Sequence, residues 1–216
     1  MKVIKPSVEV LTRLSGIEIL KDIELAARTC YKTEDKITDE SYLNFVQMIL
    51  NRGHEAMIEF GFMMARIVCD RGVTHEIVRH RLFSFAQEST RYCNYNKDKF
   101  DNQLTFINPC YWNQKPGEFN VLTREKYGIW EEQMQSAENA YIQLTNKGAK
   151  PQEARAVLPN SLKTEIVVCG NLREWRHFFE LRTAPTAHPQ MIEVAKMALE
   201  QFRNHVPLIF DETGTL

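Results

Sequence analysis

The sequence lacks several features that would assign a protein to a specialised class. Its five cysteines are scattered and show no Cys-x-x-Cys spacing, which gives neither a zinc site nor a disulfide framework and suits a reducing compartment. No apolar run approaches the ~20 residues that span a bilayer, and no signal peptide is apparent. The net charge of −1 argues against a dedicated nucleic-acid binder, whose domain is normally basic. We therefore expect a cytoplasmic protein with no metal site and no membrane or nucleic-acid partner.

The overall composition and length are those of one globular domain. The chain has 216 residues, of which 44% are hydrophobic and 25% are charged, and this length suffices for a substantial core. No internal repeat, low-complexity tract or long linker interrupts it. We therefore expect a single domain over residues 1–216.

Few strands and several long helices are predicted by the spacing of apolar residues. Strands are expected over 2–11 (interrupted by Pro6), 62–69 and 162–169, with short candidates at 91–95 and 104–108. Helices are expected over 17–31, 38–52, 72–81, 121–147, 151–158, 171–182 and 189–205. Gly53 is a plausible C-terminal cap, and Asn171 is a plausible N-cap with Glu174 in the capping-box position. This mixture indicates the α+β class.

The most informative segment reads Arg-His-Arg-Leu-Phe-Ser-Phe-Ala-Gln-Glu-Ser-Thr-Arg-Tyr and starts at residue 79. Arg79 and Arg81 flank His80, and each guanidinium is a planar fork of donors that fits phosphate or carboxylate. Ser89 adds a neutral hydroxyl, and Arg91 adds a further cation. An isolated Arg-His-Arg would be read as a basic helix end, but the added serine and arginine point to an anion with defined geometry.

This segment resembles the signature of the flavin-dependent thymidylate synthases, in which Arg-His-Arg is followed after seven residues by Ser. The element from Gly53 to Glu59 is similar to the family's Gly-His-x-Ser/Thr-x-x-Glu-His, with Ala56 at the hydroxyl position and Phe60 at the final His. Downstream, Ala-Arg-Ala-Val-Leu-Pro at 154–159, Asn-Leu-Arg at 171–173 and Leu-Arg at 181–182 match the family in the same order. Five elements in the correct order make chance agreement unlikely.

The resemblance implies a fold, an activity and an assembly. It implies a central mixed or antiparallel sheet flanked by long helices, in a homotetramer with sites shared between subunits. The implied enzyme is a methyltransferase that makes dTMP from dUMP, with 5,10-methylenetetrahydrofolate as carbon donor, FAD as electron carrier and NADPH as reductant. Because the hard chemistry belongs to the cofactor, no protein nucleophile is implied.

The resemblance also assigns residues to each ligand. The cofactor-binding residues it implies are His54, Ala56, Glu59, Arg79, His80, Arg81, Gln87, Asn171, Arg173 and His177. The residues it implies for dUMP are Glu76, Arg79, Gln87, Glu88, Ser89, Arg91, Arg155 and Arg182, with Arg155 supplied by a neighbouring subunit. Arg182 is the implied catalytic residue, because a fixed positive charge beside the uracil favours the N3-deprotonated base.

Two other functions remain open at this point. A cysteine-dependent thymidylate synthase is one, because Asn-Pro-Cys-Tyr at 108–111 is similar to the Pro-Cys-His of that family. The His is absent, however, and no basic residue adjoins Cys110 to activate its thiol. A non-enzymatic RNA-binding module is the other, with Tyr92, Tyr95 and Phe100 interleaved among arginines, although the neutral net charge counts against it.

Overall fold

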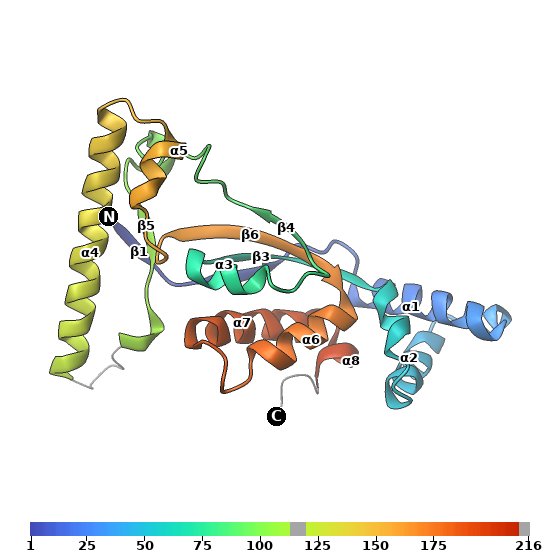
Figure 1. Cartoon of the computed structure of the whole chain (residues 1–216). Coiled ribbons are helices and arrows are strands. Elements are labelled where there is room, and N and C mark those ends of the chain that lie inside the picture. The colour runs from blue at the N-terminus through green and yellow to red at the C-terminus, as the bar shows by residue number, and fades with distance from the viewer. Residues whose placement is uncertain (113–119, 212–216) are drawn as a thin grey trace. The chain divides into compact units, whose positions relative to one another are not determined.

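The computed structural model describes residues 1–112 and 120–211, and its elements confirm the α+β class. The α-helices are α1 (Gly16–Tyr31), α2 (Ser41–Asn51), α3 (Arg71–Ile77), α4 (Val121–Asn146), α5 (Pro151–Ala154), α6 (Leu172–Arg182), α7 (Pro189–His205) and α8 (Pro207–Phe210) (Figure 1). The strands are β1 (Lys2–Ile4), β2 (Ser7–Val10), β3 (Phe62–Asp70), β4 (Ser84–Gln87), β5 (Thr105–Ile107) and β6 (Lys163–Asn171). They form a two-stranded sheet, β1–β5, and a four-stranded sheet in the order β2–β3–β6–β4.

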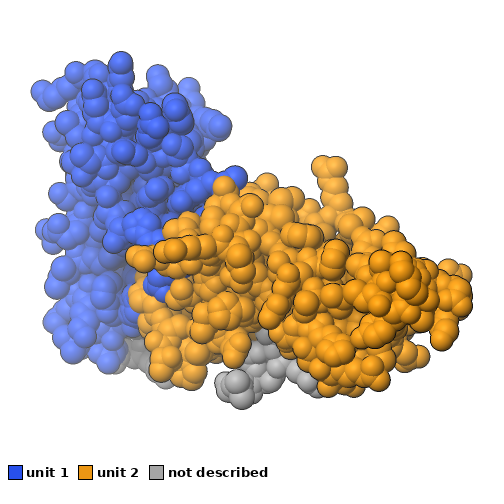
Figure 2. Space-filling view, turned by 45° about the vertical axis from the view of Figure 1, so that its right-hand side comes forward, with its two compact units in different colours: residues 1–7, 68–77, 86–166 blue, residues 8–67, 78–85, 167–216 orange. Residues whose placement is uncertain are grey.

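The chain divides into two compact units, each assembled from three separate stretches (Figure 2). Unit 1 comprises residues 1–7, 68–77 and 86–166, and unit 2 comprises residues 8–67, 78–85 and 167–216. Because neither unit is continuous in sequence, no single cut of the chain would release one of them. That residues 1–216 act as one domain stays a prediction.

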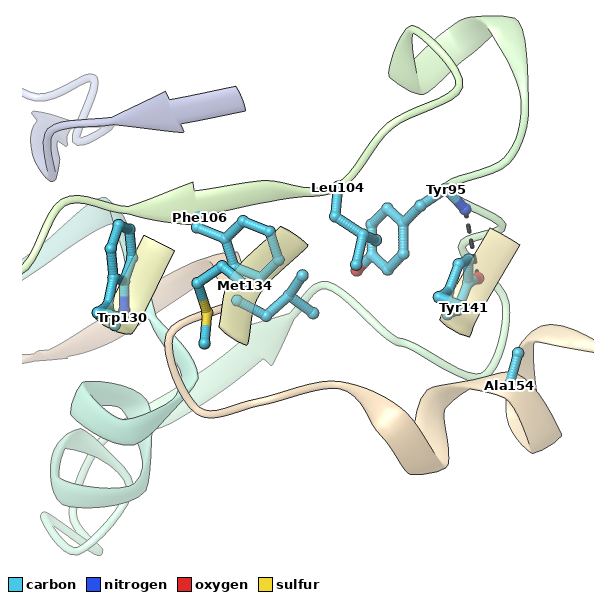
Figure 3. Packing of buried hydrophobic residues seen from close by; sticks show 8 residues of the cluster. Tyr95, Leu104, Phe106, Trp130, Met134, Tyr141 and Ala154 are labelled. Atoms are coloured by element: carbon cyan, nitrogen blue, oxygen red, sulfur yellow. Dashed lines mark hydrogen bonds between the residues drawn. The ribbon is translucent and has the colours of Figure 1, made fainter. Parts of the chain in front are cut away.

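The core of unit 1 is built on one face of α4. Trp130, Met134 and Tyr141 recur at helical spacing on this helix, and they pack against Leu104 and Phe106 from the β5 region (Figure 3). β5 pairs in parallel with β1, in the register Lys2↔Thr105 to Ile4↔Ile107. The one polar atom of the Trp130 side chain is satisfied, because Nε1 donates to Ser161 Oγ at 3.1 Å.

The core of unit 2 is an aromatic cluster centred on α6. Trp175, Phe178 and Phe179 are fully buried. The ring centroids of Trp175 and of Phe202 on α7 are 4.5 Å apart. From the sequence, Phe178, Phe179 and Leu181 are predicted to pack in the core, and the burial of Phe178 and Phe179 confirms this for those two. The same assignment was wrong for Leu181, which is 47% exposed. Leu181 is the next-to-last residue of α6, at the helix end that leads into the loop before α7.

The helix ends differ from the prediction in ways that the local hydrogen bonds explain. α2 begins at Ser41 and not near Thr38; the residues before it form a turn in which Ser41 Oγ accepts from the Thr38 N–H at 2.9 Å. The role of Gly53 after α2 is confirmed: its φ is 68°, and the next N–H, of His54, donates to the Ile49 carbonyl. The helix predicted over 72–81 is α3, which ends at Ile77.

The strand predicted over 91–95 was wrong. In its place a turn is closed by the N–H groups of Tyr92 and Cys93, which donate to the Ser89 carbonyl at 3.1 and 2.9 Å. The sequence prediction missed β4, which lies inside the signature segment, and the short helix α8. Among the helices that the structure describes, none has both the length and the apolar character needed to cross a membrane.

Candidate functional site

The turn after α3 presents the two arginines of the signature and buries the histidine between them. Arg79 and Arg81 are exposed, whereas His80 is 5% exposed. The His80 ring packs edge-on against Phe178 with centroids 4.9 Å apart, and Phe83 lies 5.9 Å away. The early end of α3 therefore has a local consequence: it lets the chain turn so that adjacent side chains face opposite surroundings.

His80 is hydrogen bonded on both ring nitrogens to side chains of α6. Arg182 Nε donates to His80 Nε2 at 3.0 Å, and His80 Nδ1 lies 3.3 Å from Glu174 Oε1. Burial, followed by the charges of Arg182 and His177, lowers the pKa of His80 from 6.5 to about 4. His80 is thus neutral at physiological pH, and its contact with Glu174 is a hydrogen bond to a carboxylate.

The start of α6 corrects one detail of the sequence prediction. Asn171 is the N-cap as predicted, with its Oδ1 accepting from the Glu174 N–H at 2.8 Å. The Glu174 carboxylate, however, goes to His80 and not back to the Asn171 backbone, and burial raises its pKa. His177 on the same helix is exposed, with its ring 6.1 Å from that of His80.

A second group of predicted cofactor residues lies around the 3₁₀ helix Glu55–Phe60. His54 caps this helix and lies 3.4 Å from the Tyr31 hydroxyl through Nδ1, while Ala56 is exposed. Arg173 at the start of α6 donates from Nη1 to Glu59 Oε1 at 2.6 Å, so the structure brings two of the predicted residues into direct contact. The hydrogen bond to Glu59 also raises the pKa of Arg173.

In unit 1, Gln87 is held at the end of β4 by two threonine hydroxyls. Its Nε2 donates to Thr74 Oγ1 at 3.0 Å and to Thr164 Oγ1 at 3.3 Å. The amide nitrogen is therefore fixed toward α3 and β6. The side-chain carbonyl oxygen is then the atom that Gln87 would offer to a ligand donor.

The predicted phosphate residues Ser89 and Arg91 share one turn. Ser89 Oγ accepts from the Arg91 N–H at 3.3 Å, and the exposed Arg91 guanidinium lies 5.4 Å from the centre of the Tyr92 ring. The serine hydroxyl therefore orders the backbone that carries the arginine. Elsewhere in unit 1, Glu76 is half-buried on α3, and Arg155 is exposed where α5 ends.

Glu88 has partners that sequence reasoning missed. Its Oε1 accepts from the Tyr95 hydroxyl at 2.7 Å, and its Oε2 lies 3.0 Å from Lys163 Nζ. Burial alone would lower the pKa of Lys163, but hydrogen bonds to Glu165 and Glu88 raise it overall. Glu88, Tyr95 and Lys163 line a cavity of about 220 Å³ in unit 1. No sequence signal links Glu88 to Lys163, which lies 75 residues further along the chain.

The two predicted ligand sets divide differently between the units. Nine of the ten cofactor residues belong to unit 2, and Gln87 is the exception. The dUMP set lies mainly in unit 1, with Arg79 and Arg182 in unit 2. In chemical terms, unit 2 offers the exposed guanidinium groups of Arg79, Arg81 and Arg173, which fit the phosphates of a dinucleotide. The donor set is thus compatible with FAD.

Comparison with known proteins gives a consistent result. A family model described as "Thymidylate synthase complementing protein" matches residues 16–208. The flavin-dependent thymidylate synthase of Corynebacterium efficiens is 33% identical over 214 residues, covering 93% of this chain and 81% of the relative. The enzyme of the same name from Geobacter sulfurreducens is 31% identical over 201 residues, covering 89% of this chain and 81% of the relative.

Solved structures agree in fold. The UMP/dUMP methylase PolB from Streptomyces cacaoi, bound with 5-Br dUMP, has a TM-score of 0.76 at 21% identity and covers 98% of this chain and 96% of its own. The flavin-dependent thymidylate synthase of Helicobacter pylori, complexed with FAD and dUMP, has a TM-score of 0.73 at 20% identity and covers 96% and 99%. At these identities the likeness shows the fold.

Proposed function

The chain belongs to the flavin-dependent thymidylate synthase family, and on that premise we propose that it methylates dUMP to dTMP. The carbon comes from 5,10-methylenetetrahydrofolate, and NADPH is the reductant. The observation that carries the proposal is the family match over residues 16–208, inside which the Arg-His-Arg-x7-Ser signature begins at residue 79. Family membership also removes the reason to prefer a cysteine-dependent synthase or an RNA-binding module.

The cofactor residues act by holding and orienting FAD. When bound, FAD supplies the electron-transfer chemistry that protein side chains lack. Arg79, Arg81 and Arg173 pair with its phosphates, and Glu59 orients Arg173 through the bond between them. The remaining contacts with the cofactor come from His54, Gln87, Asn171 and His177, and Ala56 contributes its backbone. His80 belongs to this set through its backbone, because its ring is buried and both ring nitrogens are hydrogen bonded within the protein.

The substrate residues act on the two ends of dUMP. Ser89 and Arg91 hold the phosphate, assisted by Arg79 and by Arg155 of a neighbouring subunit. At the other end, Arg182 places a fixed positive charge beside the uracil and stabilises the N3-deprotonated base, which enriches the ring for attack. Glu76, Gln87 and Glu88 complete the dUMP set.

The test is an activity assay that is run with all components present and then with each component omitted in turn. Purified protein loaded with FAD is incubated with dUMP, methylenetetrahydrofolate and NADPH, and dTMP is measured by mass spectrometry. We expect dTMP only when every component is present, together with oxidation of NADPH. UMP serves as a competing substrate, because one structural neighbour is described as a UMP/dUMP methylase. Flavin-loaded protein that forms no dTMP would contradict the proposal.

We also propose a homotetramer whose sites combine residues of different subunits. Family resemblance supports this, and so do large apolar side chains that stand exposed in the isolated chain, such as Leu82 (74%) and Ile129 (65%). Sedimentation analysis should give a mass four times that of the 25.2 kDa chain. A monomer that retains full activity would contradict the shared site.

For location, we propose the cytoplasm. The five cysteines are scattered along the sequence without the spacing of a disulfide framework, as expected of a protein in a reducing compartment. Fractionation of cells that express the protein tests this, with recovery in the cytoplasmic fraction expected and recovery outside it contradicting the proposal.

A further inference from the structure

His80 joins two residues of α6 that lie about two helical turns apart. Glu174 and Arg182 occupy one side of the helix together with Phe178, since successive steps of four residues stay near one face. The imidazole lies along this face, with Nδ1 toward Glu174 at 3.3 Å and Nε2 toward Arg182 at 3.0 Å. Phe178 supports the ring between them at 4.9 Å.

The chemistry of the two neighbours requires one tautomer of His80. An arginine has donors and no acceptor, so the Nε2 atom that meets Arg182 Nε must carry the lone pair. An ionised carboxylate only accepts, so the Nδ1 atom that meets Glu174 must carry the proton. The two demands agree, and both are met by neutral imidazole protonated on Nδ1. Protonation of Nε2 would place two N–H groups against each other.

Burial gives this arrangement its selectivity. His80 is 5% exposed and Glu174 is 7% exposed, so water cannot easily replace either partner. The guanidinium of Arg182 is planar, and a hydrogen bond at Nε therefore fixes the orientation of the whole group. The orientation of Arg182 thus depends on Glu174, which acts on it through His80.

We propose that Glu174 is a positioning residue for the reaction, whose carboxylate selects the Nδ1–H tautomer of His80 and thereby holds Arg182 in one orientation. This inference rests on the proposed role of Arg182 at the uracil. Glu174 was visible in the sequence only as a helix-start residue, because its partner His80 lies 94 residues away.

The kinetic test compares two substitutions at Glu174 with a control on the same helix. Glu174→Leu removes the acceptor, and we expect kcat for dTMP formation to fall by about 10- to 100-fold, by analogy with loss of the hydrogen-bond partner that orients a metal-bound side chain. KM for dUMP and flavin content should change little. Glu174→Gln keeps an acceptor oxygen and should restore most of kcat. The control is Glu180→Gln, an exposed glutamate on α6, which should behave as the unmodified protein.

A second measurement addresses the tautomer without any activity. In protein labelled with ¹⁵N histidine, the His80 signals are assigned by their loss in His80→Gln. We expect a protonated Nδ1 and an unprotonated Nε2, with the Nε2–H form gaining population in Glu174→Leu. An Nε2–H tautomer in the unmodified protein would overturn the proposal, as would equal kcat losses in Glu174→Leu and Glu174→Gln. If neither the unmodified protein nor any variant makes dTMP, but His80 is protonated on Nδ1 as expected, the proposed function fails and the relation between Glu174 and His80 stands.

Discussion

Arg173 Nη1 and Glu59 Oε1 lie 2.6 Å apart, so two residues assigned to the flavin by family resemblance are paired with each other. Both side chains are partly exposed, at 51% and 43%, which leaves them accessible to a ligand. An arginine that is already oriented loses less freedom when it binds a phosphate.

The first prediction follows from this pair. Glu59→Gln should weaken FAD binding by about two- to fivefold, because an exposed ion pair is a modest restraint. Arg173→Ala should weaken it more, and the double variant should be no worse than Arg173→Ala alone. Fluorescence titration with FAD measures all three. Glu9→Gln is the matched control, because Glu9 forms a similar exposed pair with Arg66 at 3.0 Å. Tighter binding by Glu59→Gln would mean that Glu59 repels the flavin phosphates.

The second prediction concerns Ser89. Its hydroxyl accepts from the Arg91 N–H, so its loss should disturb the turn and remove one contact to the dUMP phosphate. Ser89→Ala should weaken dUMP binding by about 1–3 kcal/mol and keep turnover at saturating dUMP. Isothermal titration and steady-state kinetics measure the two effects, with the exposed Ser84→Ala as control. Loss of turnover with normal dUMP affinity would assign Ser89 a catalytic role.

The third prediction concerns Arg182. Removing one group that stabilises developing charge typically costs about 10²–10³ in rate, so Arg182→Ala should lower kcat by that amount. Flavin content should remain, because the exposed arginines of the cofactor set are intact. Arg182→Lys should recover part of the rate, since the charge remains and the planar fork is lost. Arg176→Ala, on the same helix, is the control. Normal turnover in Arg182→Ala would remove this residue from the site.

The fourth prediction concerns the contact between Gly170 and Phe83. A Cβ at Gly170 would overlap the ring of Phe83, which follows the signature arginines by two residues. Gly170→Ala should therefore destabilise the protein by about 1–3 kcal/mol and weaken FAD binding through displacement of that turn. Thermal unfolding and FAD titration report the two effects. Gly128→Ala is the control, because nothing lies within 4 Å of the added Cβ. An undiminished melting temperature in Gly170→Ala would show that Phe83 can move freely.

The sequence predicted the elements whose signals are local. α6 begins at its Asn171 cap and ends near Arg182 as expected, because capping and helical spacing are short-range properties. β4 was missed because four residues are too few to establish an alternating pattern within a segment rich in loop signals.

The candidate site shows the same limit at longer range. The signature identified Arg79, His80 and Arg81, but not that His80 is buried between exposed neighbours. Its contacts with Glu174 and Arg182 span 94 and 102 residues, and nothing in a single sequence marks such pairs. Residue types could therefore be predicted, whereas the partners that orient them could not.

The fifth prediction concerns the pH dependence of stability that His80 introduces. The groups facing its ring are Arg182, His177 and Glu174, and its pKa is lowered from 6.5 to about 4, mainly by burial. Between these pH values the unfolded chain binds a proton at His80 that the folded chain does not. The free energy of unfolding must therefore fall as the pH is lowered from about 6.5 to about 4, and be unaffected by this residue above 6.5.

The comparison with His80→Gln isolates this contribution from that of the carboxylates. The difference in free energy of unfolding between the unmodified protein and His80→Gln should be constant above pH 6.5. Below pH 6.5 the unmodified protein should lose stability relative to His80→Gln. By pH 4 the shift should reach roughly 2–3 kcal/mol, since one pKa unit corresponds to about 1.4 kcal/mol. Urea unfolding at each pH measures it, with His75→Gln controlling for loss of an exposed histidine. A difference that stays constant down to pH 4 would mean that His80 titrates alike in both states, and therefore that burial and the charge of Arg182 do not hold it neutral.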